Sequence, residues 1–189
     1  MLVLKAYADG LTAALAKGLK IDQIYSVASF FISRIDTEVD KTLSPDSELK
    51  GTAAIANAIM AYQAFEDFNK SADWLSLQTK GANLQRPLWA STGVKDPAYD
   101  PTRYVMQLVA AHTVNTMPEN TLKAVRESGV FAGDTITSNY QSAKATLAKL
   151  ALMGVDLEKI TEFLEIDGVS KFEAAWMELI ETVKTVSGK

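Results

Sequence analysis

The chain contains no cysteine and only one histidine, His112. Without cysteine it can form neither a disulfide nor a thiolate-ligated metal site, and one histidine is too few for an all-protein zinc site. His112 also lacks a patterned partner, so we do not expect it to belong to a catalytic triad. We therefore expect neither a metal nor a cofactor.

An excess of positive charge and long apolar runs are also missing. The chain has 23 acidic against 19 basic residues, a formal net charge of −4 and a pI near 5.1. No basic stripe is present that would neutralise a phosphate backbone, so nucleic acid is not an expected partner. No run reaches the roughly 18 apolar residues of a membrane helix. Because charges at Lys5 and Asp9 leave too short an apolar stretch for a signal peptide, we expect a cytoplasmic protein.

What the chain does have is the composition of a folded protein. It is 48% hydrophobic and 22% charged over 189 residues, far from the compositions that stay disordered. This length is typical of one domain. We therefore predict a single domain over 1–189.

Three segments have the composition of strands. Residues 25–35 are rich in β-branched and aromatic side chains without polar alternation, as in a strand buried on both faces. A second strand is predicted over 87–91, where a proline begins the apolar run, and a third over 113–116. Helical periodicity is found over 4–19, 49–68, 102–109 and 119–128 and in a tail over 139–186, with Asp36 as a helix cap and with breaks at Gly154 and Gly168.

Strands that alternate with long helices indicate parallel βαβ units and an α/β fold. A closed barrel of this kind needs eight strands and roughly 250 residues, whereas only three strands are predicted. Three parallel strands would also leave two edges unpaired. We therefore expect a partial domain.

In parallel α/β folds the functional residues lie at the carboxyl ends of the strands. The period of two places Ser29, Phe31 and Ser33 on one face of the first strand, with Arg34 at its exit.

At the end of the second predicted strand, Ser91 shares a face with Trp89, and Lys95 follows in a loop. Two cations and serine hydroxyls at neighbouring strand ends suit a phosphate group, since arginine supplies a planar fork and lysine a mobile charge.

Structural explanations stand beside this one. Arg34 can form local ion pairs with Asp36 and Glu38 at a helix start, and Lys95 can be a solvated loop residue. Trp89 and Phe31 can belong to the core.

Four segments resemble bacterial transaldolases in order. Residues 27–41, VASFFISRIDTEVDK, resemble the family's sixth-strand region, and 50–57 with 61–64 resemble the helix that follows. Residues 85–99, QRPLWASTGVKDPAY, resemble the seventh strand, and 113–118, TVNTMP, the eighth. The likeness extends over nearly the whole chain and is greatest to the longer subfamily, which also occurs fused to a glucose-6-phosphate isomerase domain.

The resemblance implies a parallel (β/α)8 TIM-barrel fold, represented here by about the last three strands and the carboxyl-terminal helices. It also implies a transferase of the pentose phosphate pathway, in which a lysine forms a Schiff base with a ketose phosphate and passes a dihydroxyacetone unit to an aldose phosphate. In the family the lysine lies on the fourth strand, with an aspartate on the first and a glutamate on the third. We therefore expect no catalytic residue on this chain.

By the same resemblance Arg34 and Ser91 are phosphate-binding residues, and Ser29 and Phe31 line the sugar channel, to which we add Ser33 from the predicted strand face. Lys95 is a further candidate phosphate partner. Its assignment is only a hypothesis, because many relatives outside this subfamily place an arginine closer to the serine.

Three functions stay open. The first is transaldolase, with the other strands supplied by a longer parent chain or a companion polypeptide that carries the amino-terminal half. The second is a non-catalytic half-barrel whose strand edges drive homo-oligomerisation. The third is a sugar-phosphate isomerase or binding protein that uses only Arg34, Ser91 and Lys95.

Overall fold

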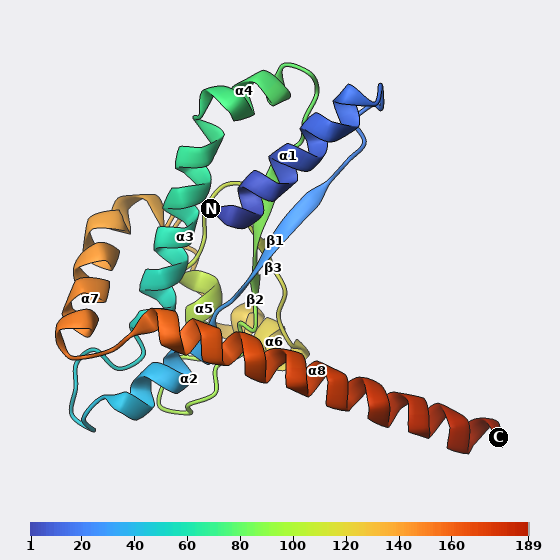
Figure 1. The fold of residues 1–189 in the computed structure, drawn as a ribbon. Helices are drawn as coiled ribbons and strands as arrows, with labels where there is room; N and C mark the ends of the chain where they lie inside the picture. Colours follow the sequence, from blue (N-terminus) through green and yellow to red (C-terminus); the bar gives the residue numbers. More distant parts are fainter. Residues whose placement is uncertain (189) are drawn as a thin grey trace.

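A computed structural model describes residues 1–188 and shows a three-stranded parallel sheet in the order β1-β2-β3 (Figure 1). Strand β1 spans Ser26–Phe31, β2 spans Gln85–Ala90, and β3 is limited to Val114–Asn115. Ser26 lies opposite Gln85, and Leu88 lies opposite Val114. The predicted α/β fold with parallel strands is therefore confirmed, whereas a single partial domain over 1–189 stays a prediction.

Helices connect and surround these strands (Figure 1). They are α1 Leu2–Ala16, α2 Ser33–Thr42, α3 Ala53–Asn69, α4 Ala72–Gln78, α5 Arg103–Met106, α6 Glu119–Ser128, the 3-10 turn η1 Thr137–Asn139, α7 Tyr140–Leu152 and α8 Leu157–Ser187. Helix α4 had no sequence prediction. Its Ser71 cap accepts a bond from the Trp74 backbone N–H at 3.3 Å. No helix within 1–188 is long and apolar enough to span a membrane.

The first strand is shorter than predicted. It ends at Phe31, and the predicted extension to residue 35 is wrong because Ser33 already begins α2. The Ile32 and Ser33 amides still donate to the Ala90 and Ser91 carbonyls, at 2.9 and 3.0 Å, but they do so as the chain turns into the helix. Ser33 is therefore not on the strand face of Ser29 and Phe31, and Arg34 lies in the first helical turn.

Two predicted helix boundaries are also wrong. Gly168 does not end a helix, because α8 continues through it without interruption. Asp36 does not cap its own helix, whose N-cap position is Ile32. Its carboxylate instead accepts a bond at 2.8 Å from the Ala54 backbone N–H, in the first turn of α3.

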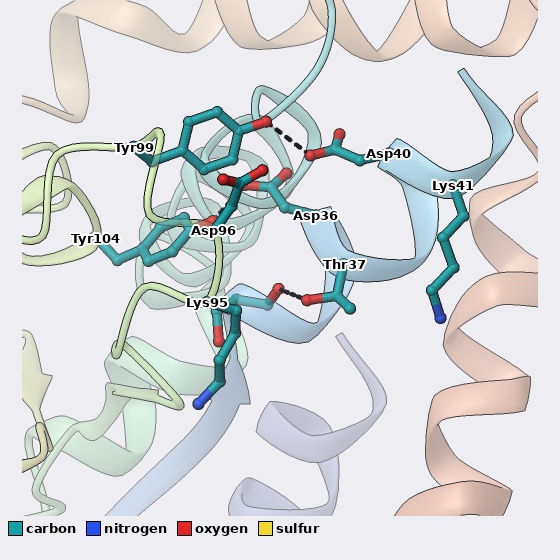
Figure 2. A pocket seen from close by; sticks show the side chains of 9 residues that line it. Asp36, Thr37, Asp40, Lys41, Lys95, Asp96, Tyr99 and Tyr104 are labelled. Carbon is teal, nitrogen blue, oxygen red and sulfur yellow. Dashed lines mark hydrogen bonds between the residues drawn. The ribbon is translucent and has the colours of Figure 1, made fainter. Parts of the chain in front are cut away.

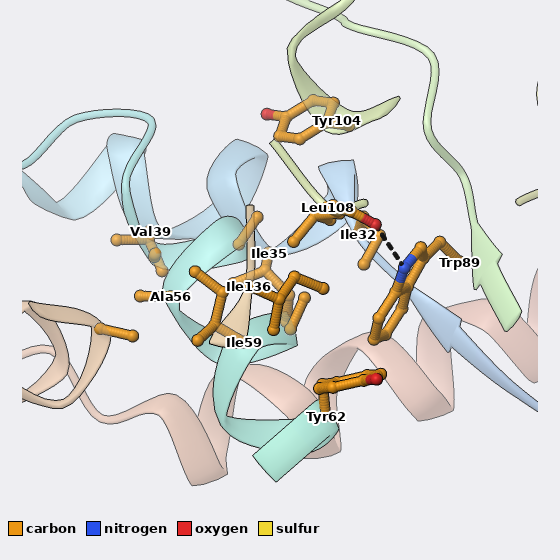
Figure 3. Close-up of a cluster of buried hydrophobic side chains, with 14 of the residues drawn as sticks. Ile32, Ile35, Val39, Ala56, Ile59, Tyr62, Trp89, Tyr104, Leu108 and Ile136 are labelled. Carbon is orange, nitrogen blue, oxygen red and sulfur yellow. Dashed lines mark hydrogen bonds between the residues drawn. The ribbon is translucent and has the colours of Figure 1, made fainter. Parts of the chain in front are cut away.

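The core lies between one face of the sheet and α3 (Figure 3). Trp89 of β2 is 1% exposed, and its indole N–H donates to the Leu108 carbonyl at 3.0 Å. Phe30 of β1 meets the Trp89 ring edge-on at 6.0 Å, and Ile59 and Tyr62 of α3 are buried in the same cluster. Trp89 therefore belongs to the core, as the structural explanation held.

The opposite face of the sheet is open. Burial alternates along β1, and Val27 and Phe31 remain 45% and 42% exposed. Phe31 is therefore not a core residue, contrary to the structural explanation given for it. Since neighbouring residues of a strand point to opposite faces, Ser29 lies on the open face with Val27 and Phe31.

Candidate functional site

The predicted site residues lie around the carboxyl end of the sheet, but they line two different cavities. Ser29, Phe31 and Arg34 line one cavity of about 380 Å³, which we call the Arg34 cavity. Its other walls come from residues of β1, α2, α3 and α8, namely Phe30, Ile35, Asn57, Thr161, Leu164, Glu165, Gly168, Val169 and Phe172. In Figure 1, α8 crosses the carboxyl ends of β1 and β2.

The Arg34 guanidinium is stacked on an aromatic ring and is available to bind an anion. Its guanidinium carbon lies 5.0 Å from the centroid of the Phe31 ring, within the range of a cation–π contact. The ion pair with Asp36 or Glu38 that the structural explanation proposed is absent from the described residues, where Glu38 instead pairs with Lys41 at 2.7 Å. The Arg34 charge thus lies against an aromatic ring, and among residues 1–188 it forms no ion pair with a carboxylate.

The second cavity, about 370 Å³, contains Ser33 and Lys95, and we call it the Lys95 cavity (Figure 2). Its other residues are Asp36, Thr37, Asp40, Lys41, Asp96, Tyr99 and Tyr104. The Lys95 side chain is exposed and points away from Asp36 and Asp40. The structure therefore does not bring Lys95 and Arg34 into one cavity.

Ser91 connects the two strand ends. Its hydroxyl lies 3.0 Å from the Ser33 hydroxyl. It follows the last residue of β2 and has φ of +55°, in the left-handed region that non-glycine residues seldom occupy. The prediction that Ser91 continues the Trp89 face of the strand is therefore wrong. Such conformations gather at functional sites.

Helix α2 carries Ser33 and Arg34, and its Asp36 side chain bonds it to neighbouring helices. This carboxylate is 2% exposed and also accepts a bond from the Tyr104 hydroxyl at 2.6 Å. Burial raises the pKa of Asp36, while the bonds from Tyr104 and Ala54 and the charge of Arg103 oppose the rise. Burial and the Asp36 charge likewise raise the pKa of Tyr104. Together the two groups join α2, α3 and α5.

Asp40, one turn further along α2, holds the loop that follows β2. Its carboxylate accepts bonds from the Tyr99 hydroxyl and the Gly51 backbone N–H, each at 2.8 Å. Burial, then the hydrogen bond to Asp40, raises the pKa of Tyr99 to about 12. Arg103 stacks on the Tyr99 ring at 4.4 Å and donates to the Gly51 carbonyl. The loop that bears Lys95 is thereby tied to the helix that bears Arg34.

Sequence reasoning missed the function of these carboxylates and of α8. Asp36 and Asp40 are four residues apart and so lie on one helix face, a spacing that could have indicated a shared set of partners. No local sequence pattern indicates that α8 lines this cavity. The contact depends on how a segment 130 or more residues after β1 folds back over that strand.

The described lysines do not resemble an activated amine. All are exposed except Lys50, which is partly buried, and none of them lines the Arg34 cavity. A lysine that forms a Schiff base is usually desolvated or close to another cation. Among residues 1–188, no group of three or more histidine, aspartate or glutamate side chains is arranged to hold a metal ion.

Parallel strands, helical connections and polar groups at the carboxyl ends of the strands define an α/β protein with its site at that edge. The family model described as Transaldolase/Fructose-6-phosphate aldolase matches residues 3–183, and the chain belongs to that family. The resemblance found in the sequence is confirmed.

Individual relatives agree. The chain is 50% identical over 188 residues to Transaldolase 1 of Streptomyces avermitilis, covering 97% of this chain and 50% of the relative. It is 49% identical over 191 residues to a transaldolase of Parafrankia sp., with coverage of 98% and 52%. A transaldolase of Mycobacterium bovis is 48% identical over 188 residues, with coverage of 96% and 50%. The chain thus spans about half the length of the curated relatives it matches.

Proposed function

We propose that this chain supplies the phosphate-binding side of a transaldolase, which transfers a dihydroxyacetone unit between ketose and aldose phosphates through a Schiff base in the pentose phosphate pathway. The single observation that carries the proposal is the Arg34 guanidinium, which is stacked on Phe31, free of any described salt bridge, and placed in a cavity at the end of β1. Arginine forms strong charge-assisted bonds to phosphate oxygens. A cytoplasmic location stays a prediction.

The open face of the sheet supports a barrel. In a (β/α)8 barrel the helices cover the outer face, while the inner face of each strand is lined by side chains from the other strands. Here α3 covers one face, and Val27, Ser29 and Phe31 lie on the uncovered one. We propose that this face is the barrel interior and that Ser29 and Phe31 line the sugar channel. A longer parent chain or a companion polypeptide would supply the other strands.

Ser91 and Ser33 are proposed to act together at the next strand end. One hydroxyl of the pair donates to the other, so the hydrogen of the second hydroxyl remains for a phosphate oxygen. The backbone conformation of Ser91 directs its side chain towards Ser33. Lys95 is proposed only as an outer phosphate contact, since it lies in the neighbouring cavity on a loop fixed through Tyr99.

The proposed Schiff-base lysine lies outside this chain. The exposure of most described lysines, and the finding that none of them lines the Arg34 cavity, support this assignment. The chain would then bind a sugar phosphate without carrying out the chemistry.

Titration with fructose 6-phosphate, followed by two-dimensional amide NMR, tests the phosphate assignment. We expect shifts of the Arg34 and Ser29 amides with fructose 6-phosphate and none with unphosphorylated fructose. Arg34→Ala should weaken binding by about 2 kcal/mol, the loss of a charge-assisted contact. Equal affinity of the wild-type chain and Arg34→Ala would remove the proposal, as would equal binding of fructose.

The half-barrel as an oligomerising module is the second function. The exposed Val27 and Phe31 beside the free edge of β1 favour it. Sedimentation velocity distinguishes this function from the phosphate-binding one. An oligomerising half-barrel should sediment as a homo-oligomer, and Phe31→Ser should dissociate it.

A further inference from the structure

Helix α8 forms one wall of the Arg34 cavity. The α8 residues that line it recur every three or four positions and so share one helix face, namely Thr161, Leu164, Glu165, Gly168, Val169 and Phe172. The same helix packs against α2, which carries Arg34. Any ligand that reaches the guanidinium from this cavity must therefore fit beneath this face of α8.

Gly168 lies close to the guanidinium of Arg34. A β-carbon built at Gly168 would lie 3.7 Å from Nη1 of Arg34, an ordinary van der Waals contact. Every longer side chain would extend into the space beside the guanidinium. Glycine is unfavourable in a helix interior, and no positive φ requires it at this position. The absence of a side chain at Gly168 instead lets the Arg34 guanidinium lie close to α8.

Glu165 lies one turn before Gly168 and lines the same cavity, so an acidic residue belongs to this wall. It forms no ion pair with Arg34 in the described part of the chain, whose salt bridges involve other residues. A carboxylate near the guanidinium weakens the attraction for an incoming anion. Glu162, on the same helix, does not line the cavity.

We propose that Gly168 and Glu165 are specificity-determining residues, which set the size and the charge of the group that binds to Arg34. The phosphate of the sugar binds beside the guanidinium, in the part of the cavity that a longer side chain at position 168 would fill, and Glu165 limits its affinity. The inference rests on the proposed function, because it takes Arg34 as the phosphate ligand, and adds α8 as a wall of that site.

The test measures the dissociation constant of fructose 6-phosphate for the full 189-residue chain and four α8 variants by NMR titration. Gly168→Leu should weaken binding by about tenfold, since a branched side chain at this position displaces the Arg34 guanidinium or the ligand beside it. Glu165→Gln should strengthen binding by about threefold, because it removes a negative charge. Ser170→Leu and Glu162→Gln are matched controls on the same helix and should leave affinity unchanged.

The outcomes separate the two proposals. No fructose 6-phosphate binding by the chain, or equal affinity of Arg34→Ala and the wild type, overturns both. If Arg34→Ala weakens binding but Gly168→Leu and Glu165→Gln leave the affinity unchanged, only the proposed role of α8 is overturned. Circular dichroism of Gly168→Leu checks that α8 is retained. If that variant loses the helix, Glu165→Gln against Glu162→Gln decides alone, and equal affinity of these two contradicts the inference.

Discussion

Removal of the Tyr104 hydroxyl should weaken the structure that holds Arg34 in place. Tyr104 donates at 2.6 Å to Asp36, whose side chain is buried and whose other described bond comes from the Ala54 amide. Tyr104→Phe leaves one oxygen of a carboxylate that is only 2% exposed without that donor. Loss of a hydrogen bond to a buried charged group costs about 1.5–3 kcal/mol. We expect a decrease of that size in the free energy of unfolding at pH 7.

The stability cost of Tyr104→Phe should depend on pH in a defined direction. Burial raises the pKa of Asp36, so its contribution to stability is complete below the usual aspartate pKa and is lost as the pH rises through the higher folded pKa. The Tyr104 hydroxyl opposes this rise, and Tyr104→Phe should raise the pKa of Asp36 further. The difference in stability between wild type and variant should therefore be greatest at neutral pH and decrease as Asp36 becomes protonated.

Urea denaturation between pH 4 and pH 7 measures both effects. Tyr25→Phe is the control, because the Tyr25 side chain is 74% exposed and should tolerate the same change without loss of stability. A Tyr104→Phe cost below about 0.5 kcal/mol, the usual range of neutral surface changes, would refute the assigned hydrogen bond. A cost independent of pH would refute the assignment to the Asp36 carboxylate.

Three further predictions concern other parts of the site and its support. Gly51→Ala should cost about 2–3 kcal/mol in urea denaturation, because φ is +67° and the new β-carbon would lie 2.7 Å from the Tyr99 ring. Gly154→Ala, with φ of +86° and open space around it, should cost less; equal costs would contradict the clash. Trp89→Ala should cost about 3–5 kcal/mol in the same assay, since it empties a buried site, and a cost below 1 kcal/mol would contradict its place in the core. Lys95→Ala should weaken fructose 6-phosphate binding by about 0.5–1 kcal/mol, as for an exposed charge, and unchanged affinity in calorimetry would remove Lys95 from the site.

The sequence was sufficient for the strands and for most helices because their patterns are local. The apolar run around Phe30 and the proline that begins the run to Trp89 both mark strands that the structure contains. The end of the first strand was predicted too late, since Ile32 and Ile35 favour a strand by composition but pack against the core from a helical turn. Tertiary contacts overrode the local preference.

The arrangement of the site could be predicted only in part. The order of parallel strands was enough to place Ser29, Phe31 and Arg34 at one edge of the sheet, where they line one cavity. The separation of Lys95 from Arg34 could not be foreseen, because the conformation of the loop after β2 involves long-range contacts such as the bond between Tyr99 and Asp40. The participation of Gly168 depends in the same way on how α8 folds back over the strands.

Borohydride trapping with fructose 6-phosphate tests the central claim most directly, namely that this chain has the phosphate-binding side of a transaldolase and not its Schiff-base lysine. The chain and a full-length relative would be treated in parallel, and adducts read by intact mass and peptide mapping. We predict an adduct on the relative and none on this chain. A trapped adduct on one lysine of this chain would contradict the claim, because it would show that the chain has a nucleophile of its own.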